Sequence, residues 1–512
     1  MFFHNRFIEL LEARGAAEVA LQRGDELVRV GQLLAESQQL AAQLWRVGCR
    51  AGDRLVMASE PGPDFLRLIF ATMILQCQVA IIDPEMGRDN YREKLRQFAP
   101  QWAIVDTRLL FLREHPLLRW IYLRWNKSGP YFPQTDAVKL ISTGPRLPLW
   151  QKHQTLRQLK RAAPLPFNWQ NGNPDHPYLV TYTSGTQSVP KGVVHRLSSL
   201  AHSIELIVDL LRSLGPQRVA THLPHFMLIG VCAGIPVHLW RPRATAAERL
   251  AFIRDQKISI LFGPPAEYLE LLGELQKRGE ERFPDCLQHV LLGSAPVHVP
   301  FLERLIERLP AHTRITCLYG MTENLLVSTC DGRQKVEYPC RGDLLGRPAA
   351  GVNLEIAADG EILIQSPQLY RNYWHLNSRP HWHPTGDLGY LDEEQLLVLT
   401  GRKKEMIIRR NFNLYPALYE PTVKKIPGVT EAVFVGIYEE VLADEVVFLV
   451  IEGNEKLPLA DLEKKLQRGI FSIDREAWPD RILQMAIPRS GRQQKVDRRT
   501  LKAQIRQNYS KQ

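Results

Sequence analysis

Short apolar runs alternate with helical stretches through much of this 512-residue chain, and this alternation limits its fold more than any other feature. Arg54–Met57 has the pattern of a strand, 64–77 has the three-to-four-residue apolar spacing of a helix, and Val79–Ile82 is again strand-like. The same order returns between residues 218 and 330. Strands that alternate with helices form mainly parallel sheets covered on both faces. We therefore expect an α/β fold of packed mixed β-sheets with helices.

The length of the chain predicts two or more domains, because single hydrophobic cores stop growing at about 300 residues. Residues 346–400 change to short strands with turns, which we expect to form a small β-barrel-like part. A short charged link, Gly-Arg-Lys-Lys at 401–404, precedes a C-terminal unit of strands and helices that is large enough to be a domain. We expect a large N-terminal domain over 1–401 and a small α+β domain over 402–512, joined by a hinge.

Charge and cysteine usage narrow the class of partner. The formal net charge is +10, but acids lie among the basic residues and no nucleic-acid recognition module is present, so we expect no nucleic-acid partner. The seven cysteines form no C-x-x-C pair, which is typical of buried thiols in a cytoplasmic chain. No transmembrane segment is expected. The apolar, aromatic and basic stretch 109–125 either packs as a core helix or touches a membrane surface peripherally.

A hydroxyl-rich loop is the most informative motif. Residues 183–186 read Thr-Ser-Gly-Thr directly after the apolar stretch 178–182, and Lys191 and Gly192 close the loop. Backbone N–H groups, hydroxyls and an ammonium on one loop suit the oxygens of a polyphosphate. A Walker A loop does not fit, because neither Ser nor Thr follows Lys191. The alternative is a polar surface turn.

Three further motifs carry side chains suited to a nucleotide. Residues 318–323 read Leu-Tyr-Gly-Met-Thr-Glu, which supplies an aromatic face for a base and a carboxylate oxygen of the kind that Mg²⁺ prefers. Residues 382–389 contain Thr-Gly-Asp, whose carboxylate can accept hydrogen bonds from both hydroxyls of a ribose. Residues 488–498 form a basic segment that contains one lysine, Lys495. The respective alternatives are a helix N-cap, a common turn and a solvated basic loop.

Taken in order, these motifs resemble those of the adenylate-forming superfamily of acyl-CoA synthetases, adenylation domains and luciferases. The resemblance extends from about residue 5 to about residue 505. It implies a ligase that uses ATP and Mg²⁺ to convert a carboxylic acid, fatty or otherwise apolar, to acyl-AMP with release of pyrophosphate. The acyl group then passes to a thiol acceptor, which is coenzyme A or the pantetheine of an acyl carrier protein.

The resemblance also implies roles for individual residues. Lys495, Thr322 and Glu323 are the implied catalytic residues, with Glu323 also on Mg²⁺. Tyr319 would lie against adenine, and Lys404 would be the hinge. The implied ATP- and AMP-binding residues are Thr183, Ser184, Gly185, Thr186, Lys191, Gly293, Ser294, Ala295, Tyr319, Asp387 and Arg402.

An acyl pocket is implied around Met227, Gly230 and Gly320. Met227 stands where many members of the superfamily carry a histidine, which implies a wide apolar pocket. His225 lies nearby but out of register with that histidine, so we expect it to be structural.

The chain departs from the pattern of the superfamily at several positions. Ser188 and Gln494 stand where glycines are usual, and Arg410 and Asn411 replace two glycines where a pantetheine or another acceptor comes close. The loss of the two glycines at 410 and 411 favours a carrier protein or an intramolecular acceptor, whereas Ser188 and Gln494 favour a loss of catalysis. One alternative is therefore a β-lactone synthetase that closes a long-chain 3-hydroxy acid on its own adenylate. The other is a catalytically silent binding or scaffold protein of the same fold.

Overall fold

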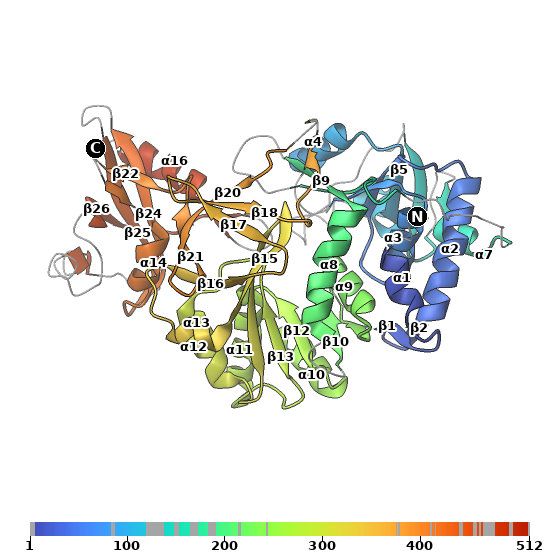
Figure 1. Cartoon of the computed structure of the whole chain (residues 1–512), viewed down its shortest axis with the longest axis horizontal. Helices are drawn as coiled ribbons and strands as arrows, with labels where there is room; N and C mark the ends of the chain where they lie inside the picture. The colour runs from blue at the N-terminus through green and yellow to red at the C-terminus, as the bar shows by residue number, and fades with distance from the viewer. Residues whose placement is uncertain are drawn as a thin grey trace.

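Two large sheets with helices between and outside them, followed by smaller sheets, make up the chain (Figure 1). The computed structural model describes residues 6–82, 88–118, 138–147, 153–163, 173–182, 191–212, 217–241, 244–374, 376, 379–409, 412–414, 416–439, 444–453, 458–459, 462–463, 477–490 and 495–509. No helix within these ranges is long and apolar enough to cross a membrane.

The first large sheet has the strand order β19-β9-β8-β4-β3-β5-β6-β7. Its pairs are parallel except for β8 with β9 and β9 with β19, which are antiparallel. The strands are β3 (Arg54–Ala58), β4 (Gln78–Ile81), β5 (Trp102–Asp106), β6 (Lys139–Thr143), β7 (Gln154–Thr155), β8 (Pro177–Tyr182), β9 (Gly192–Arg196) and β19 (Asn372–Tyr373).

The second large sheet has the order β17-β18-β20-β21-β16-β15-β14-β13-β12-β10-β11-β1-β2. Pairing is parallel from β14 to β1, and antiparallel from β17 to β14 and between β1 and β2. The antiparallel part contains residues 346–400, which were expected to form a small β-barrel-like part. Its strands do not close into a barrel, because β17 lies at the edge of the sheet. The strands are β1 (Val19–Arg23), β2 (Glu26–Arg29), β10 (Val219–Thr221), β11 (Val237–Leu239), β12 (Ile260–Gly263), β13 (His289–Leu292), β14 (Arg314–Met321), β15 (Asn324–Asp331), β16 (Asp343–Pro348), β17 (Asn353–Ile356), β18 (Glu361–Gln365), β20 (His383–Leu391) and β21 (Leu397–Arg402).

Helices fill the space between the two sheets and cover their outer faces. The inner helices share one apolar cluster with strands of both sheets; they are α1 (Arg6–Glu12), α2 (Val30–Arg46), α3 (Pro63–Ile74), α7 (Leu156–Arg161), α8 (Leu197–Arg212) and α9 (Pro224–Ala233). The helices that cover the outer face of the first sheet are α4 (Arg88–Phe98) and α5 (Thr107–Glu114). The helices that pack on the second sheet are α10 (Ala246–Asp255), α11 (Pro265–Arg278), α12 (Val299–Arg308) and α13 (Gly332–Glu337).

Alternation along β3 shows why this layered arrangement follows from the sequence. Leu55 and Met57 belong to the inner cluster, whereas Val56 between them belongs to the cluster on the outer face. Successive side chains of a strand point to opposite faces, so a strand covered on both faces is a continuous apolar run. The α/β class expected from the alternating pattern is confirmed.

The C-terminal part repeats the same principle on a smaller scale. Strands β24 and β25 send alternate side chains into two clusters, one with α14 and the other with α16. The pairings here are β22 with β23, β24-β25-β26, and β27 with β28. The elements are β22 (Ile407–Arg409), β23 (Phe412–Leu414), α14 (Pro416–Lys424), β24 (Val429–Glu439), β25 (Asp444–Gly453), β26 (Arg481–Gln484), β27 (Arg489–Ser490), β28 (Lys495–Val496) and α16 (Arg498–Tyr509).

Most of the expected elements lie where the periodicity placed them, within a few residues. Residues 119–125 of the aromatic and basic stretch fall outside the described residues. The described part of that stretch belongs to α5 and to exposed residues such as Leu117, whose side chain is 69% exposed.

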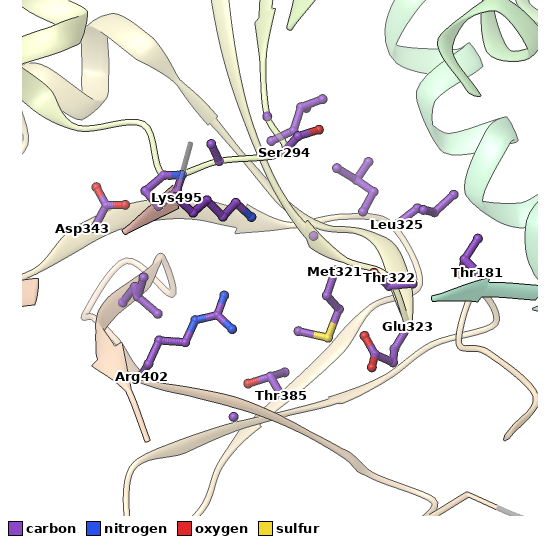
Figure 2. A pocket seen from close by; sticks show the side chains of 18 of the residues that line it. Thr181, Ser294, Met321, Thr322, Glu323, Leu325, Asp343, Thr385, Arg402 and Lys495 are labelled. Carbon is purple, nitrogen blue, oxygen red and sulfur yellow. The ribbon is translucent and has the colours of Figure 1, made fainter. Parts of the chain in front are cut away.

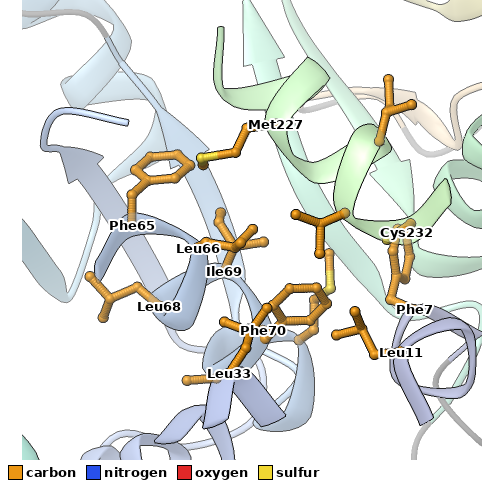
Figure 3. Close-up of a cluster of buried hydrophobic side chains, with 14 of the residues drawn as sticks. Phe7, Leu11, Leu33, Phe65, Leu66, Leu68, Ile69, Phe70, Met227 and Cys232 are labelled. Carbon is orange, nitrogen blue, oxygen red and sulfur yellow. The ribbon is translucent and has the colours of Figure 1, made fainter. Parts of the chain in front are cut away.

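Phe70 tests the importance of the inner cluster. It is fully buried on α3 among side chains of α1, α2 and α9 (Figure 3), so Phe70→Ala leaves a cavity that neighbouring helices fill only in part. We expect a loss of about 3–5 kcal/mol in the free energy of unfolding, measured by denaturant titration. The matched control Leu117→Ala, at an exposed position, should change it by less than about 0.5 kcal/mol. Equal effects would contradict the layered core.

Candidate active site

One large cleft brings together residues of both large sheets and of the C-terminal part (Figure 2). Its volume is about 3710 Å³. Single small-molecule pockets usually measure about 300–1,000 Å³. The cleft therefore has room for more than one small ligand at a time.

A tight hairpin carries two of the predicted catalytic residues into this cleft. Thr322 and Glu323 connect β14 to β15, so the helix N-cap considered as an alternative is wrong. A Cβ on Gly320 would lie 2.0 Å from the carbonyl oxygen of Leu325 on the opposite strand. Only glycine permits this approach of the two backbones. The glycine predicted for an acyl pocket thus lines the cleft and also shapes the turn.

Two residues that the motifs did not identify hold this turn. The buried His195 of β9 lies with Nε2 2.8 Å from the carbonyl oxygen of Thr322. Since a carbonyl only accepts, Nε2 carries the proton, and burial lowers the pKa of His195 to about 4, which keeps the ring neutral. The Tyr373 hydroxyl donates to Glu323 Oε1 at 2.9 Å. Lys191 Nζ lies 5.3 Å from the centroid of the same tyrosine ring, so Tyr373 lies between the lysine and the carboxylate.

The sequence signals for these two residues differ. His195 was not predicted, although it lies three residues beyond Gly192 on the strand that leaves the hydroxyl-rich loop, a position that could have pointed to it. Tyr373 reaches the site because the two-residue strand β19 pairs with β9 across about 180 positions of the chain. No local pattern predicts such a pairing.

Asp387 is fully buried between two protein partners. Arg402, its cross-strand neighbour, places Nε 2.6 Å from Oδ1, and the Tyr319 hydroxyl donates to Oδ2 at 2.6 Å. Burial raises the pKa of Asp387, while the Arg402 charge and the Tyr319 hydrogen bond oppose this. Arg402 lines the cleft, but Tyr319 and Asp387 lie behind its surface, in contrast to their predicted contacts with adenine and ribose. A ribose that binds Asp387 has to replace Arg402 or Tyr319 as a hydrogen-bond partner of this carboxylate.

The loop after β13 contributes Gly293, Ser294 and Ala295 to the lining, as predicted for an adenine-side loop. Ser294 has a φ of 64°, which is uncommon for a residue other than glycine. Strained backbone of this kind gathers at binding sites, where the surrounding structure compensates for it. The loop therefore forms one wall of the cleft with a backbone conformation that the surrounding structure holds in place.

The acyl-pocket prediction needs correction on α9. Met227 is fully buried in the inner cluster, beside Phe65 in Figure 3. A Cβ on Gly230 would lie 2.6 Å from the Val237 side chain, so this glycine lets the helix pack closely on β11. Neither residue lines the cleft. Successive helical residues turn by about 100°, and the lining comes from their neighbours instead.

His225 is one of those neighbours, so the expectation that it is purely structural is also corrected. Its ring is accessible from the cleft and meets the Phe262 ring edge-on, with centroids 5.7 Å apart. Surrounding protein atoms desolvate the ring and lower the pKa of His225 to about 4. It is therefore a neutral wall residue at neutral pH.

Lys495 extends into the cleft from the C-terminal side, near Arg402 (Figure 2). Desolvation and the neighbouring Arg402 charge lower the pKa of Lys495 below its usual value. The segment is anchored by Arg498, which donates to the Phe434 carbonyl at 2.8 Å and to Glu420 at 2.7 Å. The C-terminal elements thus hold a partly desolvated ammonium at the cleft.

Lys404 also lines the cleft, as an exposed residue in the turn that separates β21 from β22. Several predicted residues fall outside the description. These are Thr183, Ser184, Gly185 and Thr186 of the hydroxyl-rich loop, and the departures Ser188, Arg410, Asn411 and Gln494. The flanks of the loop are described: Tyr182 of β8 pairs with Gly192 of β9, which places Lys191 at the cleft.

The donor set limits what metal the cleft can hold. Within the described residues, no group of three or more His, Cys, Asp or Glu side chains is arranged to hold a metal ion. Glu323 alone offers a carboxylate at the turn. Mg²⁺ commonly binds through one or two carboxylates together with substrate phosphates and water. These residues therefore fit a Mg²⁺ ion that arrives with a phosphate ligand.

Comparison with known proteins agrees with this chemistry. The family model described as AMP-binding enzyme matches residues 12–374. An indoleacetate–CoA ligase from Aromatoleum aromaticum is 29% identical over 451 residues, covering 82% of this chain and 82% of that protein. An olefin β-lactone synthetase from Stenotrophomonas maltophilia is 26% identical over 464 residues, covering 79% and 78%. The solved o-succinylbenzoate coenzyme A synthetase of Bacillus subtilis, in complex with ATP and magnesium, has the same fold, with a TM-score of 0.77 at 20% identity over 97% of this chain and 99% of that one.

Gly320→Ala tests the geometry of the turn. The added methyl would overlap the Leu325 carbonyl, so β14 and β15 must separate and displace Thr322 and Glu323. We expect a destabilisation of about 1–3 kcal/mol, measured by thermal unfolding. Gly273→Ala, on α11 with open space around the glycine, is the matched control and should not destabilise. A neutral Gly320→Ala variant would contradict the close approach.

The buried histidines predict a pH dependence of stability. Burial lowers the pKa of His195, His289 and His383 to about 4, whereas the unfolded value is about 6.5. Between these values the unfolded chain binds protons that the folded chain does not, so the free energy of unfolding should fall as pH drops from about 6.5 to about 4. His195→Gln keeps a donor for the Thr322 carbonyl and should flatten this slope by about 1.4 kcal/mol per pH unit. An unchanged slope in denaturant titrations would contradict the neutral, buried ring.

Proposed function

Because the chain belongs to the AMP-binding enzyme family, we propose that it is an acid–thiol ligase that uses ATP to convert a carboxylic acid to acyl-AMP. The observation that carries this proposal is the gathering of Lys191, Arg402 and Lys495 around one cleft with the Thr322–Glu323 turn. Three cations and a hydroxyl turn suit a triphosphate and a carboxylate that have to meet. The name of the indoleacetate–CoA ligase relative supports the ligase class.

The first half-reaction joins two anions. A carboxylate oxygen attacks the α-phosphorus of ATP, the bond from that phosphorus to the bridging oxygen breaks, and pyrophosphate leaves. Lys495 would lie between the carboxylate and the α-phosphate and offset their repulsion. Its partial desolvation strengthens this effect, because electrostatic interactions are stronger where water is excluded.

The Thr322–Glu323 turn would orient the phosphates. His195 and Tyr373 fix the turn from behind, which leaves the Thr322 hydroxyl for the α-phosphate. Glu323 would hold the Mg²⁺ that accompanies ATP, and the ion would neutralise phosphate charge there. Thr183, Ser184, Gly185, Thr186 and Lys191 would bind the β- and γ-phosphates. Gly293, Ser294 and Ala295 would border adenine, and Arg402 the ribose. Tyr319 and Asp387 would reach the adenine and the ribose only once their hydrogen bond or the Asp387–Arg402 ion pair is exchanged for the nucleotide.

A rotation between two domains would separate the half-reactions. We propose domains over 1–401 and 402–512 with Lys404 as the pivot. This is supported by the sheet organisation, since the described strands up to β21 belong to the large sheets and those from β22 onward pair only among themselves. Hinge closure of this kind is a common way to change the groups around a bound intermediate.

The acyl group would be fatty or otherwise apolar and would pass to coenzyme A or to a carrier-protein pantetheine. The match to an olefin β-lactone synthetase favours a second candidate, in which the hydroxyl of a 3-hydroxy acid attacks its own adenylate. All seven cysteines are free thiols, which supports the expected cytoplasmic location.

ATP–pyrophosphate exchange with a panel of carboxylic acids tests the proposal. We expect acid-dependent exchange that falls by about 10²-fold or more in Lys495→Ala, while ATP binding, measured calorimetrically, is retained. The matched control Lys277→Ala, an exposed lysine on α11, should keep full exchange. Full exchange in Lys495→Ala would contradict the role of this lysine.

The acceptor is decided in a second assay. Adding coenzyme A or a phosphopantetheinylated carrier protein to the acyl-AMP reaction should give a thioester, detected by mass spectrometry. A β-lactone formed from a 3-hydroxy acid without any thiol would instead support the second candidate.

A further inference from the structure

The cleft continues from the nucleotide side into an apolar channel between α3, α8 and α9. Its lining on α3 consists of Phe65, Leu66, Ile69 and Met73. On α8 it consists of Leu200, Ile204 and Ile207. The α9 lining is also uncharged at neutral pH, since its polar member is the neutral His225. An uncharged wall of this kind favours hydrocarbon over water.

The lining is long in one direction. Phe65, Ile69 and Met73 of α3 are spaced by four, so they share one face of the helix, and Phe65 to Met73 spans about 12 Å at 1.5 Å per residue. The α8 residues repeat this spacing over about 10 Å. Two such faces form a deep channel, in contrast to the shallow slot that a single aromatic ring needs.

The near end of the channel lies at the reaction site. His195, just before α8, contacts the Thr322 carbonyl, and His225 in the first turn of α9 contacts Phe262 at the end of β12. Both helices thus begin near the cleft. They also end together, because Arg212 at the end of α8 donates to the Ala233 carbonyl at the end of α9. The order Leu200, Ile204, Ile207 is therefore an order of increasing depth.

The far end is closed by the N-terminal helix. Phe7 of α1 lines the channel, is 1% exposed and lies near Cys232, in the last turn of α9 (Figure 3). Arg6 forms an ion pair with Glu205, which fixes α1 against α8. Phe7 is thus placed to limit how far a ligand can extend.

We propose that this channel binds the hydrocarbon chain of a long, unbranched aliphatic acid, with α8 as its wall and Phe7 as its end. The proposal rests on the proposed function, because the carboxyl group would lie between Thr322 and Lys495. Ile207 and Phe7, which carry no catalytic role, then determine the longest chain that is accepted.

The test is ATP–pyrophosphate exchange over straight-chain acids from butanoic to octadecanoic, with phenylacetic acid as the aromatic probe. We expect kcat/KM to rise about fourfold per added methylene, which corresponds to about 0.8 kcal/mol for each buried CH₂, and then to level off. Ile207→Trp should move this plateau to shorter acids, so that kcat/KM falls more for long acids than for butanoic acid. Phe7→Ala should move it to longer acids. The exposed control His202→Trp on α8 should keep the wild-type profile.

Three outcomes would overturn the proposal. Butanoic or phenylacetic acid could be preferred over long acids, Ile207→Trp could lower exchange equally at every chain length, or Phe7→Ala could leave the plateau unmoved. Each of these leaves adenylation itself intact, whereas absence of exchange with every acid would contradict the proposed function as well. If Ile207→Trp does not fold, as judged by circular dichroism, the proposal is tested by the chain-length profile of the wild type and by the shift of its plateau in Phe7→Ala.

Discussion

The close approach of β14 and β15 at Gly320 is the constraint on which the cleft depends. The turn that it forms is short and carries Thr322 and Glu323 at the cleft. The Thr322 carbonyl of this turn faces His195. Tyr373, on the strand that pairs with the His195 strand, donates to Glu323, so strands of the two large sheets meet at this turn. A neutral histidine suits the contact, because a buried charge there would need a partner. The phosphate-binding turn is thus part of the packing between the sheets.

The same packing also creates the apolar channel. Helices α3, α8 and α9 have to bury their faces between two sheets, and the inner cluster accepts most of those side chains. Where the helices separate, the faces remain apolar and continuous with the cleft. A site for charged phosphates and a site for a hydrocarbon chain are thereby joined end to end. An amphipathic acid can bind in one orientation, because its carboxylate is attracted to the cations and its hydrocarbon chain is buried in the apolar channel.

The sequence predicted the fold and most of the cleft, because strands covered on both faces and strand-end motifs are local signals. Gly293, Thr322, Glu323, Arg402 and Lys495 follow such strands or belong to short hairpins, and all line the cleft. The failures come from non-local geometry. On α9, one or two positions separate a wall residue from a buried one, so Met227 and Gly230 were assigned to the wrong face. Likewise, the pairing of β19 with β9 and the contact of Tyr319 with Asp387 depend on strands distant in the chain.

The central claim is that one ligand extends from the Thr322–Lys495 site along α8 to Phe7. A crystal structure with a non-hydrolysable sulfamoyl analogue of a long-chain acyl adenylate tests it most directly. The account predicts the sulfamoyl group between Thr322 and Lys495, with the alkyl chain passing Leu200, Ile204 and Ile207. An analogue whose chain leaves the cleft toward solvent, or whose adenosine lies away from the Gly293–Ala295 loop, would contradict it.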